Sequence, residues 1–387
     1  MILTPNQSLK ELIPNALFCK ETQAVNAQPC AWIELSSEAF FHNVAQVKQV
    51  IGSGLLASVL KANAYGHGLI EMGRLCDQTA DISFICVAFL SEALILRAAG
   101  VKKPIIVLGF VDGDIVQSLD ANIAFVVDSY EQVFALQAVA QLHKTSIDIH
   151  IKIDIGLSRR GLQKDAVTEF VHTIRQLSHI RFVGMCSHFS SSYSDETMTE
   201  SQAALFASIV QNLGAQGMPI LFIHISNSSC TNVSNCNVLR AGIALYGYNP
   251  KQLPFSLKPV LSFKTRVVQI RTVPAEVLVG YDGTYRTQRI TILAYVPIGY
   301  FDGYDIRFSN VGVMYIRGSY APVRGRVAMN MVALDVTDIL GASIGDEVII
   351  LGDIDGIRGF DLCAQSGIRN VRELLARINP LLPRFVV

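Results

Sequence analysis

The strongest constraint on the fold is a series of short apolar segments between about residues 38 and 250. Eight segments rich in β-branched residues alternate with stretches that are long enough for one helix or turn. This alternation is typical of parallel strands joined by crossover helices, and eight such units in about 210 residues are the size of a TIM-like (β/α)8 barrel. We therefore predict an α/β fold built on such a barrel. The predicted strands are Leu55–Leu60, Ser83–Phe89, Pro104–Gly109, Ile123–Val127, Ile147–Ile153, Arg181–Ser187, Ile220–Ile225 and Val238–Leu245.

An open, doubly wound sheet is the alternative fold for the same alternation of strands and helices. Such a sheet usually carries a glycine-rich phosphate loop directly after its first strand. No GxGxxG or Walker pattern follows Leu60. The barrel is therefore the preferred interpretation.

The pattern changes after about residue 250, where strand-like segments are divided by Gly, Asp, Ser and Pro. We predict a mostly β second domain that ends with a helical stretch, Asp361–Ile378. Its predicted strands are Val260–Ile270, Ile290–Val296, Val311–Ile316, Ala321–Arg326, Met331–Val336 and Glu347–Leu351. The expected domains are the barrel over 38–250 and the β domain over 251–387, with an N-terminal extension and first strand over 1–37 that packs with the β domain. Three prolines interrupt the first thirty residues, which we expect to be loosely held.

The composition disfavours several classes of function. The 32 Lys and Arg residues match the 32 Asp and Glu residues, so no overall positive charge attracts nucleic acid or acidic membranes. No apolar segment approaches the ~20 residues of a membrane span, and no signal-peptide pattern opens the chain, so we expect a cytoplasmic protein. The eight cysteines show no CxxC or paired spacing, so neither a metal site nor a disulfide framework is expected. Charged residues are only 17% of the chain, which suggests surface hidden in an oligomer.

Polar residues stand where several predicted strands end. Lys61 follows the first strand, His188 follows the sixth, and the seventh leads into the segment from His224 to Ser229. The eighth strand contains Arg240, which is followed by Ala-Gly-Ile. In a βα barrel the functional groups lie at the carboxyl ends of the strands. These residues are therefore candidates for a functional site.

The fifth predicted strand alternates strictly between isoleucine and polar residues. The isoleucines share one face, and the other face carries Asp148, His150, Lys152 and Asp154. If the isoleucines pack on helices, the charged face points into the barrel, where unpaired charges cost several kcal/mol or more. These groups must then be paired or bound to something. An edge strand with one solvated face is the alternative.

A lysine that closes an apolar strand at a barrel rim can form a Schiff base, because partial burial lowers its pKa and frees the amine for a carbonyl group. A buried, salt-bridged lysine is the commoner case, so this interpretation of Lys61 requires a phosphate site nearby. The candidates for such a site are Asn227, Ser228, Gly242 and Ile243. They lie near the seventh and eighth strands, where barrel enzymes usually hold phosphate. A Schiff-base lysine together with a phosphate site indicates pyridoxal phosphate.

The segment Lys-Ala-Asn-Ala-Tyr-Gly-His-Gly at 61–68 resembles the cofactor-lysine motif of the alanine racemases, which are fold-type III pyridoxal-phosphate enzymes. Further similar segments follow in the expected order between about Trp32 and Phe385. They include Trp32-Ile-Glu with Asn43, Lys152-Ile-Asp-Ile-Gly with Arg159 and Gly161, Ser187-His-Phe, His224 with Asn227-Ser228, Arg240-Ala-Gly-Ile-Ala-Leu-Tyr-Gly, Gly280-Tyr-Asp-Gly-Thr-Tyr, Pro297-Ile-Gly-Tyr-Phe-Asp-Gly and Gly325-Arg-Val-Ala-Met. The resemblance implies a barrel followed by a β domain, and the interconversion of L- and D-alanine, which supplies D-alanine for peptidoglycan.

The resemblance also implies the roles of individual residues. Lys61 holds the cofactor and is one acid/base group, and Tyr281 of the partner subunit is the other, so the protein is expected to be a homodimer with shared active sites. Two such groups are needed because racemisation removes a proton from one side of Cα and returns one to the other. His188 is expected to hydrogen-bond Tyr281 and to connect it to Arg240. Arg240 faces the pyridine nitrogen and, because it rarely loses a proton, leaves the ring a weaker electron sink.

The remaining implied roles concern binding. The phosphate is assigned to Tyr65, Ser228, Gly242 and Ile243, and Asn227 is a further cofactor-binding residue. Arg159 contacts the cofactor oxygen and the substrate carboxylate, and Met329 of the partner subunit completes that carboxylate site. Lys152 matches a lysine that is often carbamylated, and His224 and Tyr300 are supporting residues. Each has an ordinary alternative, since His224, Tyr300 and Met329 can also be packing residues of the core.

Three departures from the family pattern leave the substrate open. Asn330 stands where Asp is usual, Ile155 where Thr is usual, and no tyrosine follows Tyr320, although many members place one by the active site. A serine racemase or a racemase of broader specificity is therefore the alternative to an alanine racemase. A non-catalytic pyridoxal-phosphate protein is disfavoured by the 280–285 motif, and a barrel decarboxylase is disfavoured by Arg240.

Overall fold

The computed structural model describes residues 29–230, 233, 235–249 and 256–387. The chain divides into two compact units, Met1–Cys30 and Ala31–Val387, and the account below concerns the second. The predicted loose extension lies almost wholly outside the described residues.

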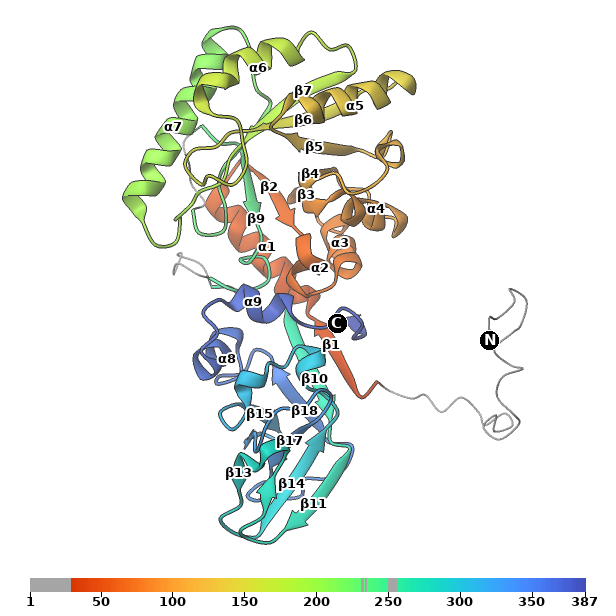
Figure 1. The fold of residues 1–387 in the computed structure, drawn as a ribbon, viewed down its shortest axis with the longest axis vertical. Coiled ribbons are helices and arrows are strands. Elements are labelled where there is room, and N and C mark those ends of the chain that lie inside the picture. Colours follow the sequence, from red (N-terminus) through yellow and green to blue (C-terminus); the bar gives the residue numbers. More distant parts are fainter. Residues whose placement is uncertain (1–28, 231–232, 234, 250–255) are drawn as a thin grey trace, which may run out of the picture. The chain divides into compact units, whose positions relative to one another are not determined.

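The first part of this unit is an eight-stranded parallel sheet in the order β8-β7-β6-β5-β4-β3-β2-β9 (Figure 1). A bridge between Asn227 and Arg240 joins the segment after β8 to β9 and brings the two ends of the sheet together. The strands are β2 (Leu55–Val59), β3 (Ile82–Phe89), β4 (Ile105–Phe110), β5 (Ile123–Val127), β6 (Ile147–Lys152), β7 (Ile180–Cys186), β8 (Phe222–His224) and β9 (Val238–Ala241). The predicted barrel and its eight strands are confirmed, and the open-sheet alternative is wrong.

Helices connect these strands and cover their outer faces. The longer helices bury an apolar stripe, as α1 does with Phe40, Val44 and Val47, and Ser36 caps α1 by accepting the amide of Ala39 at 3.1 Å. The helices are α1 (Ser37–Ile51), α2 (Lys61–Tyr65), α3 (Leu69–Asp77), α4 (Leu90–Ala98), α5 (Tyr130–Leu142), α6 (Val167–Ile174) and α7 (Glu196–Ala215), with short 3-10 turns η2 (Ile115–Ser118) and η3 (Lys164–Ala166).

Strand β6 has the two faces that the sequence predicts. Ile149 and Ile151 are fully buried in the outer core, whereas His150 and Lys152 are buried on the inner face. Because β6 pairs with β5 on one side and β7 on the other, the edge-strand alternative is wrong. At the amino end of β6, Asp148 forms an ion pair with Arg181 at 2.5 Å.

The second part is mostly β, as predicted. One sheet has the order β16-β15-β18-β10-β1-β19, a second has the order β11-β14-β17, and β12 pairs with β13. The strands are β1 (Ala31–Leu35), β10 (Leu261–Arg266), β11 (Gln269–Val273), β12 (Leu278–Val279), β13 (Tyr285–Arg286), β14 (Thr291–Val296), β15 (Val313–Ile316), β16 (Ser319–Pro322), β17 (Val332–Asp335), β18 (Glu347–Leu351) and β19 (Arg384–Val386). The 3-10 turns are η4 (Tyr281–Gly283), η5 (Tyr300–Asp302) and η6 (Ile306–Phe308).

The predicted single strand Val260–Ile270 is wrong, because the chain changes sheets within it. The amide of Val267 still bonds to Asp346 beside β18, but the amide of Val268 bonds to Tyr295 of β14. Strand β10 therefore ends at Arg266, and β11 begins in the second sheet. Here one strand-like segment contributes to two sheets, which its sequence pattern does not reveal.

Two other boundaries also differ from the prediction. The strand expected over Ala321–Arg326 ends at Pro322, after which Gly325 adopts a φ of +79°. The helix expected over Asp361–Ile378 is two helices, α8 (Gly359–Ser366) and α9 (Val371–Ala376). Gly367, with a φ of +70°, ends the first, and Asn370 caps the second.

Candidate active site

A cavity of about 590 Å³ lies at the carboxyl ends of the barrel strands. It brings together most of the residues that the sequence predicts for the site, although they come from five different strands or the loops after them. The predicted residues that line it are Lys61, Tyr65, Lys152, Arg159, His188, Asn227, Ser228, Arg240, Gly242 and Ile243. His224 is fully buried beside it, whereas Tyr281, Tyr300 and Met329 lie on the surface of the β domain, 69%, 46% and 53% exposed.

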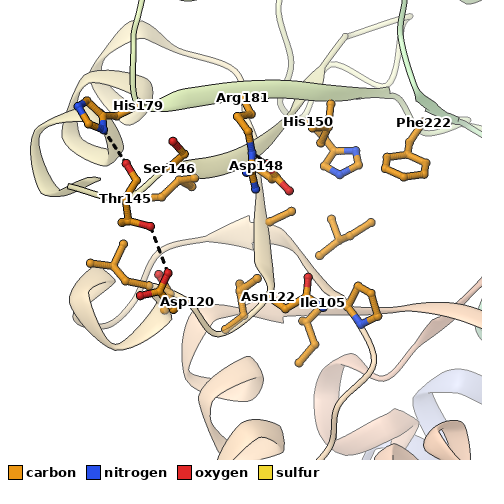
Figure 2. Close-up of a pocket in the computed structure, with 18 of the residues that line it drawn as sticks. Ile105, Asp120, Asn122, Thr145, Ser146, Asp148, His150, His179, Arg181 and Phe222 are labelled. Atoms are coloured by element: carbon orange, nitrogen blue, oxygen red, sulfur yellow. Dashed lines mark hydrogen bonds and ion pairs between the residues drawn. The ribbon is translucent and has the colours of Figure 1, made fainter. Parts of the chain in front are cut away.

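A second cavity of about 490 Å³ opens at the other end of the barrel, between the amino ends of β4, β5, β6 and β7 (Figure 2). The backbone carbonyl of Thr145 is hydrogen-bonded to His179 at 2.6 Å, and the hydroxyl of Thr145 donates to Asp120 at 3.2 Å. None of the predicted site residues lines this cavity. The active sites of barrel enzymes lie at the carboxyl ends of their strands, so the first cavity is the candidate active site.

Lys61 begins a short left-handed turn at the first strand end. The next residues, Ala62 to Tyr65, all have φ between +51° and +56°. This conformation costs about 1–2 kcal/mol per residue for residues with a Cβ. The turn is held by Glu92, which accepts the amide of Ala62 at 2.7 Å, and by Asn63, which accepts the amide of Leu69 at 2.8 Å. Strained backbone supported in this way is typical of functional sites.

The end of the chain braces the same turn. Gly66 has a φ of +85°, and a Cβ placed on it would lie 2.0 Å from the carbonyl oxygen of Leu375 in α9. Arg384 donates to the carbonyl of Gly66 at 2.9 Å. The left-handed turn after Lys61 therefore packs directly against elements more than three hundred residues later in the sequence.

The cavity is strongly cationic. Its lining includes Lys61, Lys152, Arg159, Arg160, Arg240 and Arg372, and none of its described lining residues is Asp or Glu. Only Arg160 among them has an ion pair in the described part of the chain, with Asp128 at 2.7 Å. Burial and the charge of Arg159 lower the pKa of Lys61, and burial lowers the pKa of Lys152. Such a cavity favours anionic ligands and an uncharged amine at Lys61.

A chain of hydrogen bonds runs from Arg240 into the barrel. Arg240 Nη1 lies 2.7 Å from His224 Nδ1, and His224 Nε2 lies 2.9 Å from His150 Nδ1. Because a guanidinium can only donate, His224 Nδ1 accepts, and His224 Nε2 in turn donates to His150. This order fixes both imidazoles in one neutral tautomer. The neutral form of His150 is also favoured by burial and by the charge of Arg240, which lower its pKa to about 3.

His188 lies on the other side of Arg240. Arg240 Nη2 donates to the carbonyl of Ser187 at 2.7 Å and lies 3.4 Å from His188 Nδ1. Burial and the charge of Arg240 lower the pKa of His188 to about 3, so its imidazole is neutral at physiological pH. The guanidinium is thus held by neutral acceptors and presents a fixed cation to the cavity.

Ser228, Gly242 and Tyr65 form a compact group of donors. Ser228 Oγ lies 3.1 Å from the amide of Gly242 and 3.4 Å from the amide of Ala244. A Cβ on Gly242 would lie 2.7 Å from the hydroxyl of Tyr65, so a larger residue there would displace the Tyr65 side chain. Hydroxyl and backbone N–H groups that converge after the last two barrel strands suit a phosphate.

Sequence reasoning missed Glu92, Arg160 and Arg372. Glu92 has a local signature, since it is the third residue of α4 and its carboxylate accepts the amide of Phe89 at 3.2 Å. Its contact with Ala62 depends on the tertiary fold.

In the described residues no group of three or more His, Cys, Asp or Glu side chains is placed to hold a metal ion.

Comparison with known proteins assigns the chain to a family. Residues 35–250 match the family description "Alanine racemase, N-terminal domain", and residues 260–386 match "Alanine racemase, C-terminal domain". This chain belongs to the alanine racemase family. Among curated members, the alanine racemase of Desulfovibrio desulfuricans is 32% identical over 365 residues, which cover 92% of this chain and 98% of that protein.

Solved structures of the alanine racemase family share the fold. The alanine racemase of Streptomyces lavendulae matches with a TM-score of 0.86 at 28% identity and covers 93% of this chain and 98% of its own. A histidine racemase from Leuconostoc mesenteroides matches equally well, with a TM-score of 0.85 at 27% identity over 93% of this chain and 99% of its own. The family fold therefore includes a racemase named for a different amino acid. No helix in the described part of this family member is long and apolar enough to cross a membrane.

Proposed function

We propose that this protein is a pyridoxal-phosphate-dependent alanine racemase that interconverts L- and D-alanine. The observation that carries the proposal is the position of Lys61, whose pKa is lowered by burial and which lines the same cationic cavity as the fixed guanidinium of Arg240. Membership of the alanine racemase family supports the same reaction.

The residues of the cavity fit pyridoxal phosphate. Ser228, Gly242 and Tyr65 offer hydroxyl and amide groups to a phosphate, with Asn227 and Ile243 beside them. Arg240 would face the pyridine nitrogen, and Arg159 would contact the cofactor oxygen and the substrate carboxylate. When bound, the cofactor supplies an electron sink for the Cα–H bond that breaks.

The protein then needs a proton donor and acceptor on each face of Cα. Lys61 serves one face, because burial lowers its pKa and so favours the neutral amine that can take a proton. We assign the other face to Tyr281 of the partner subunit, which His188 would hydrogen-bond and connect to Arg240. The 3.4 Å contact between His188 Nδ1 and Arg240 Nη2 supports this route.

The surface of the β domain supports a homodimer with shared sites. Tyr281, Tyr300, Phe301, Met329 and Met331 are each more than 40% exposed, although all are large and apolar or aromatic. Exposed groups of this kind mark interaction surfaces. Tyr281 is displayed on η4, where Arg326 holds the neighbouring Asp282 by an ion pair. Tyr300 and Met329 would complete the partner's site, with Met329 at its carboxylate end.

Lys152 is proposed to be carbamylated. Its amine is buried in the cavity and has no ion pair among the described residues. Burial lowers the pKa of Lys152, which favours the neutral amine that reacts with carbon dioxide. A carbamate would place an anion beside Arg159 and orient it.

We also propose the cellular role and the domain limits. The reaction would supply D-alanine for peptidoglycan in the cytoplasm. The barrel would comprise 38–250 and the β domain 251–387, and the first strand within 1–37 would belong with the β domain. The pairing of β1 with β10 supports this division.

A racemase with another substrate is the second candidate function. The structural likeness to a histidine racemase favours it, together with the missing C-terminal tyrosine. A serine racemase or a racemase of broad specificity would use the same residues with a larger pocket. A non-catalytic pyridoxal-phosphate protein is less favoured, because it would not need Tyr281.

The proposal is tested by proton exchange in D2O. Purified protein loaded with pyridoxal phosphate is given L-alanine, and NMR follows the Cα proton while a chiral assay follows D-alanine. We expect both exchange and D-alanine, and Lys61→Ala should lower the rate by about 10³-fold or more. Exchange with serine or histidine at a higher kcat/KM than with alanine would favour the second candidate. Cofactor-loaded protein that exchanges no amino acid would contradict both.

A further inference from the structure

We propose that Arg372 of α9 is a phosphate-binding residue and supplies the positive charge that the phosphate site of the barrel otherwise lacks. This inference rests on the proposed function, because the phosphate is that of the cofactor. It extends that function to a residue of the β domain to which neither the sequence motifs nor the comparisons assign a role.

The first argument is the position of Arg372. It lines the same cavity as Lys61, Tyr65 and Arg159, although it belongs to the C-terminal part of the chain. Its positive charge acts on the phenol of Tyr65, where it opposes the rise in pKa that burial causes, and it adds to the lowering of the pKa of Lys61. Tyr65 in turn lies against Gly242. Arg372 is therefore near the group of donors that suits a phosphate.

The second argument is the charge of that group. Ser228, Gly242 and Tyr65 are neutral donors, whereas a phosphate monoester carries nearly two negative charges at neutral pH. Among the other cations of the cavity, Lys61 bonds the cofactor, Arg240 is held by His224 and Ser187, and Arg160 pairs with Asp128. Arg159 is assigned to the cofactor oxygen and the substrate carboxylate, and Lys152 to a carbamate. Arg372 is left as the cation for the phosphate, and its planar guanidinium can donate two hydrogen bonds to it.

The third argument is that Arg372 is free to act. It forms no ion pair within the described residues, because the neighbouring Glu373 pairs with Arg307 and Arg377 instead. Its only side-chain hydrogen bond there is a long one, 3.4 Å, to Asn370. The backbone amide of Arg372, not its side chain, makes the 3.0 Å bond that caps α9. A change of the side chain should therefore leave the helix intact.

The helix that carries Arg372, α9, is held in place by its packing against the Lys61 turn. The carbonyl of Leu375, one turn along the same helix, lies against Gly66 at the end of the Lys61 turn. The lysine that bonds the cofactor and the arginine proposed for its phosphate are thus carried by two segments in direct contact. This packing would set the distance between the lysine and the phosphate site.

The experiment compares pyridoxal phosphate with pyridoxal, which lacks the phosphate. The cofactor-free full-length chain is titrated with each, and the absorbance change gives two dissociation constants. We expect Arg372→Ala to weaken pyridoxal phosphate by about 10- to 100-fold and to leave pyridoxal within about threefold, as for the loss of a hydrogen bond to a charged group. Arg372→Lys, which keeps the charge but loses the paired donors, should fall in between.

Controls separate this inference from the proposed function. Arg369→Ala, on the exposed loop before α9, should change neither constant. Wild-type protein that fails to bind pyridoxal phosphate would overturn the proposed function itself. If the wild type binds it, an unchanged constant in Arg372→Ala, or an equal loss for both ligands, would overturn only the role of Arg372. Arg372→Ala could instead leave cofactor affinity intact and alter the ratio of kcat/KM for aspartate and alanine. That result would also overturn the phosphate-binding role, because Arg372 would then contact the substrate side chain.

Discussion

The backbone amide of Ala62 donates a 2.7 Å hydrogen bond to the carboxylate of Glu92, which belongs to the next strand-helix unit of the barrel. The other carboxylate oxygen accepts the amide of Ala88 at 2.8 Å. One side chain thus ties the left-handed turn after Lys61 to the end of β3. It also places a negative charge near the lysine, which raises the pKa of Lys61 against the larger effect of burial.

We predict that Glu92→Gln lowers the pKa of Lys61 in the cofactor-free protein. Removal of a negative charge disfavours the protonated amine, so the pKa must fall. The measurement is the rate of pyridoxal attachment as a function of pH, whose midpoint should move to lower pH. Glu131→Gln, at an exposed position of α5, should leave the midpoint in place. A midpoint that rises in Glu92→Gln would show that the charge of Glu92 does not act on Lys61.

The contact between Gly66 and Leu375 predicts an unequal effect of two matched substitutions. Gly66 and Gly100 both have a φ of +85°, but only at Gly66 would a Cβ meet another backbone atom, and nothing lies within 4 Å of it at Gly100. Gly100→Ala should lower the free energy of unfolding by about 1 kcal/mol, the conformational cost alone. Gly66→Ala should cost at least about 3 kcal/mol, since the turn or α9 must shift. Urea unfolding of both variants checks this, and equal losses would contradict the packing.

Buried histidines predict a loss of stability in mild acid. Burial holds the pKa of His67 at about 3, whereas a histidine in the unfolded chain titrates near ~6.5. As the pH falls below about 6.5, the unfolded state takes up the proton and the folded state does not, so the free energy of unfolding decreases until about pH 3. His150 and His188 act in the same direction.

The urea midpoint should therefore stay level above about pH 7.5 and fall between about pH 6.5 and 4.5. His67→Phe keeps a ring against Tyr246, whose ring centroid lies 4.3 Å away, and should reduce the steepness of that fall. The exposed His143→Phe serves as the control. An identical pH dependence in wild type and His67→Phe would contradict the assignment.

The sequence predicts the fold well where one hydrophobic period serves one element. The isoleucines of β6 place His150 and Lys152 inside the barrel without reference to the rest of the chain. The same reasoning fails between Arg266 and Gln269, where a strand-like segment without a turn residue changes from one sheet to another. Which sheet each amide bonds to is decided by distant strands, so no local pattern contains it.

The site residues also fall into two groups, those that chain order predicts and those that depend on tertiary contacts. Lys61, Arg240 and the phosphate-binding group follow barrel strands, so their order in the chain predicts that they meet. Glu92 supports the Lys61 turn and Arg372 lines the cavity, but both do so through tertiary contacts that no local pattern predicts. Tyr281 is exposed in the single chain, so its place in a site rests on the resemblance and on a second subunit.

Mixing two inactive variants tests the shared two-base site most directly. Lys61→Ala and Tyr281→Phe are co-expressed with different tags, and the mixed dimer is purified and assayed for D-alanine formation. If each site combines Lys61 of one chain with Tyr281 of the other, the mixed dimer has one intact site and should show about half the wild-type activity, while each variant alone stays inactive. A mixed dimer as inactive as its parents would contradict the account, because Lys61 and Tyr281 would then have to come from the same chain or not act together.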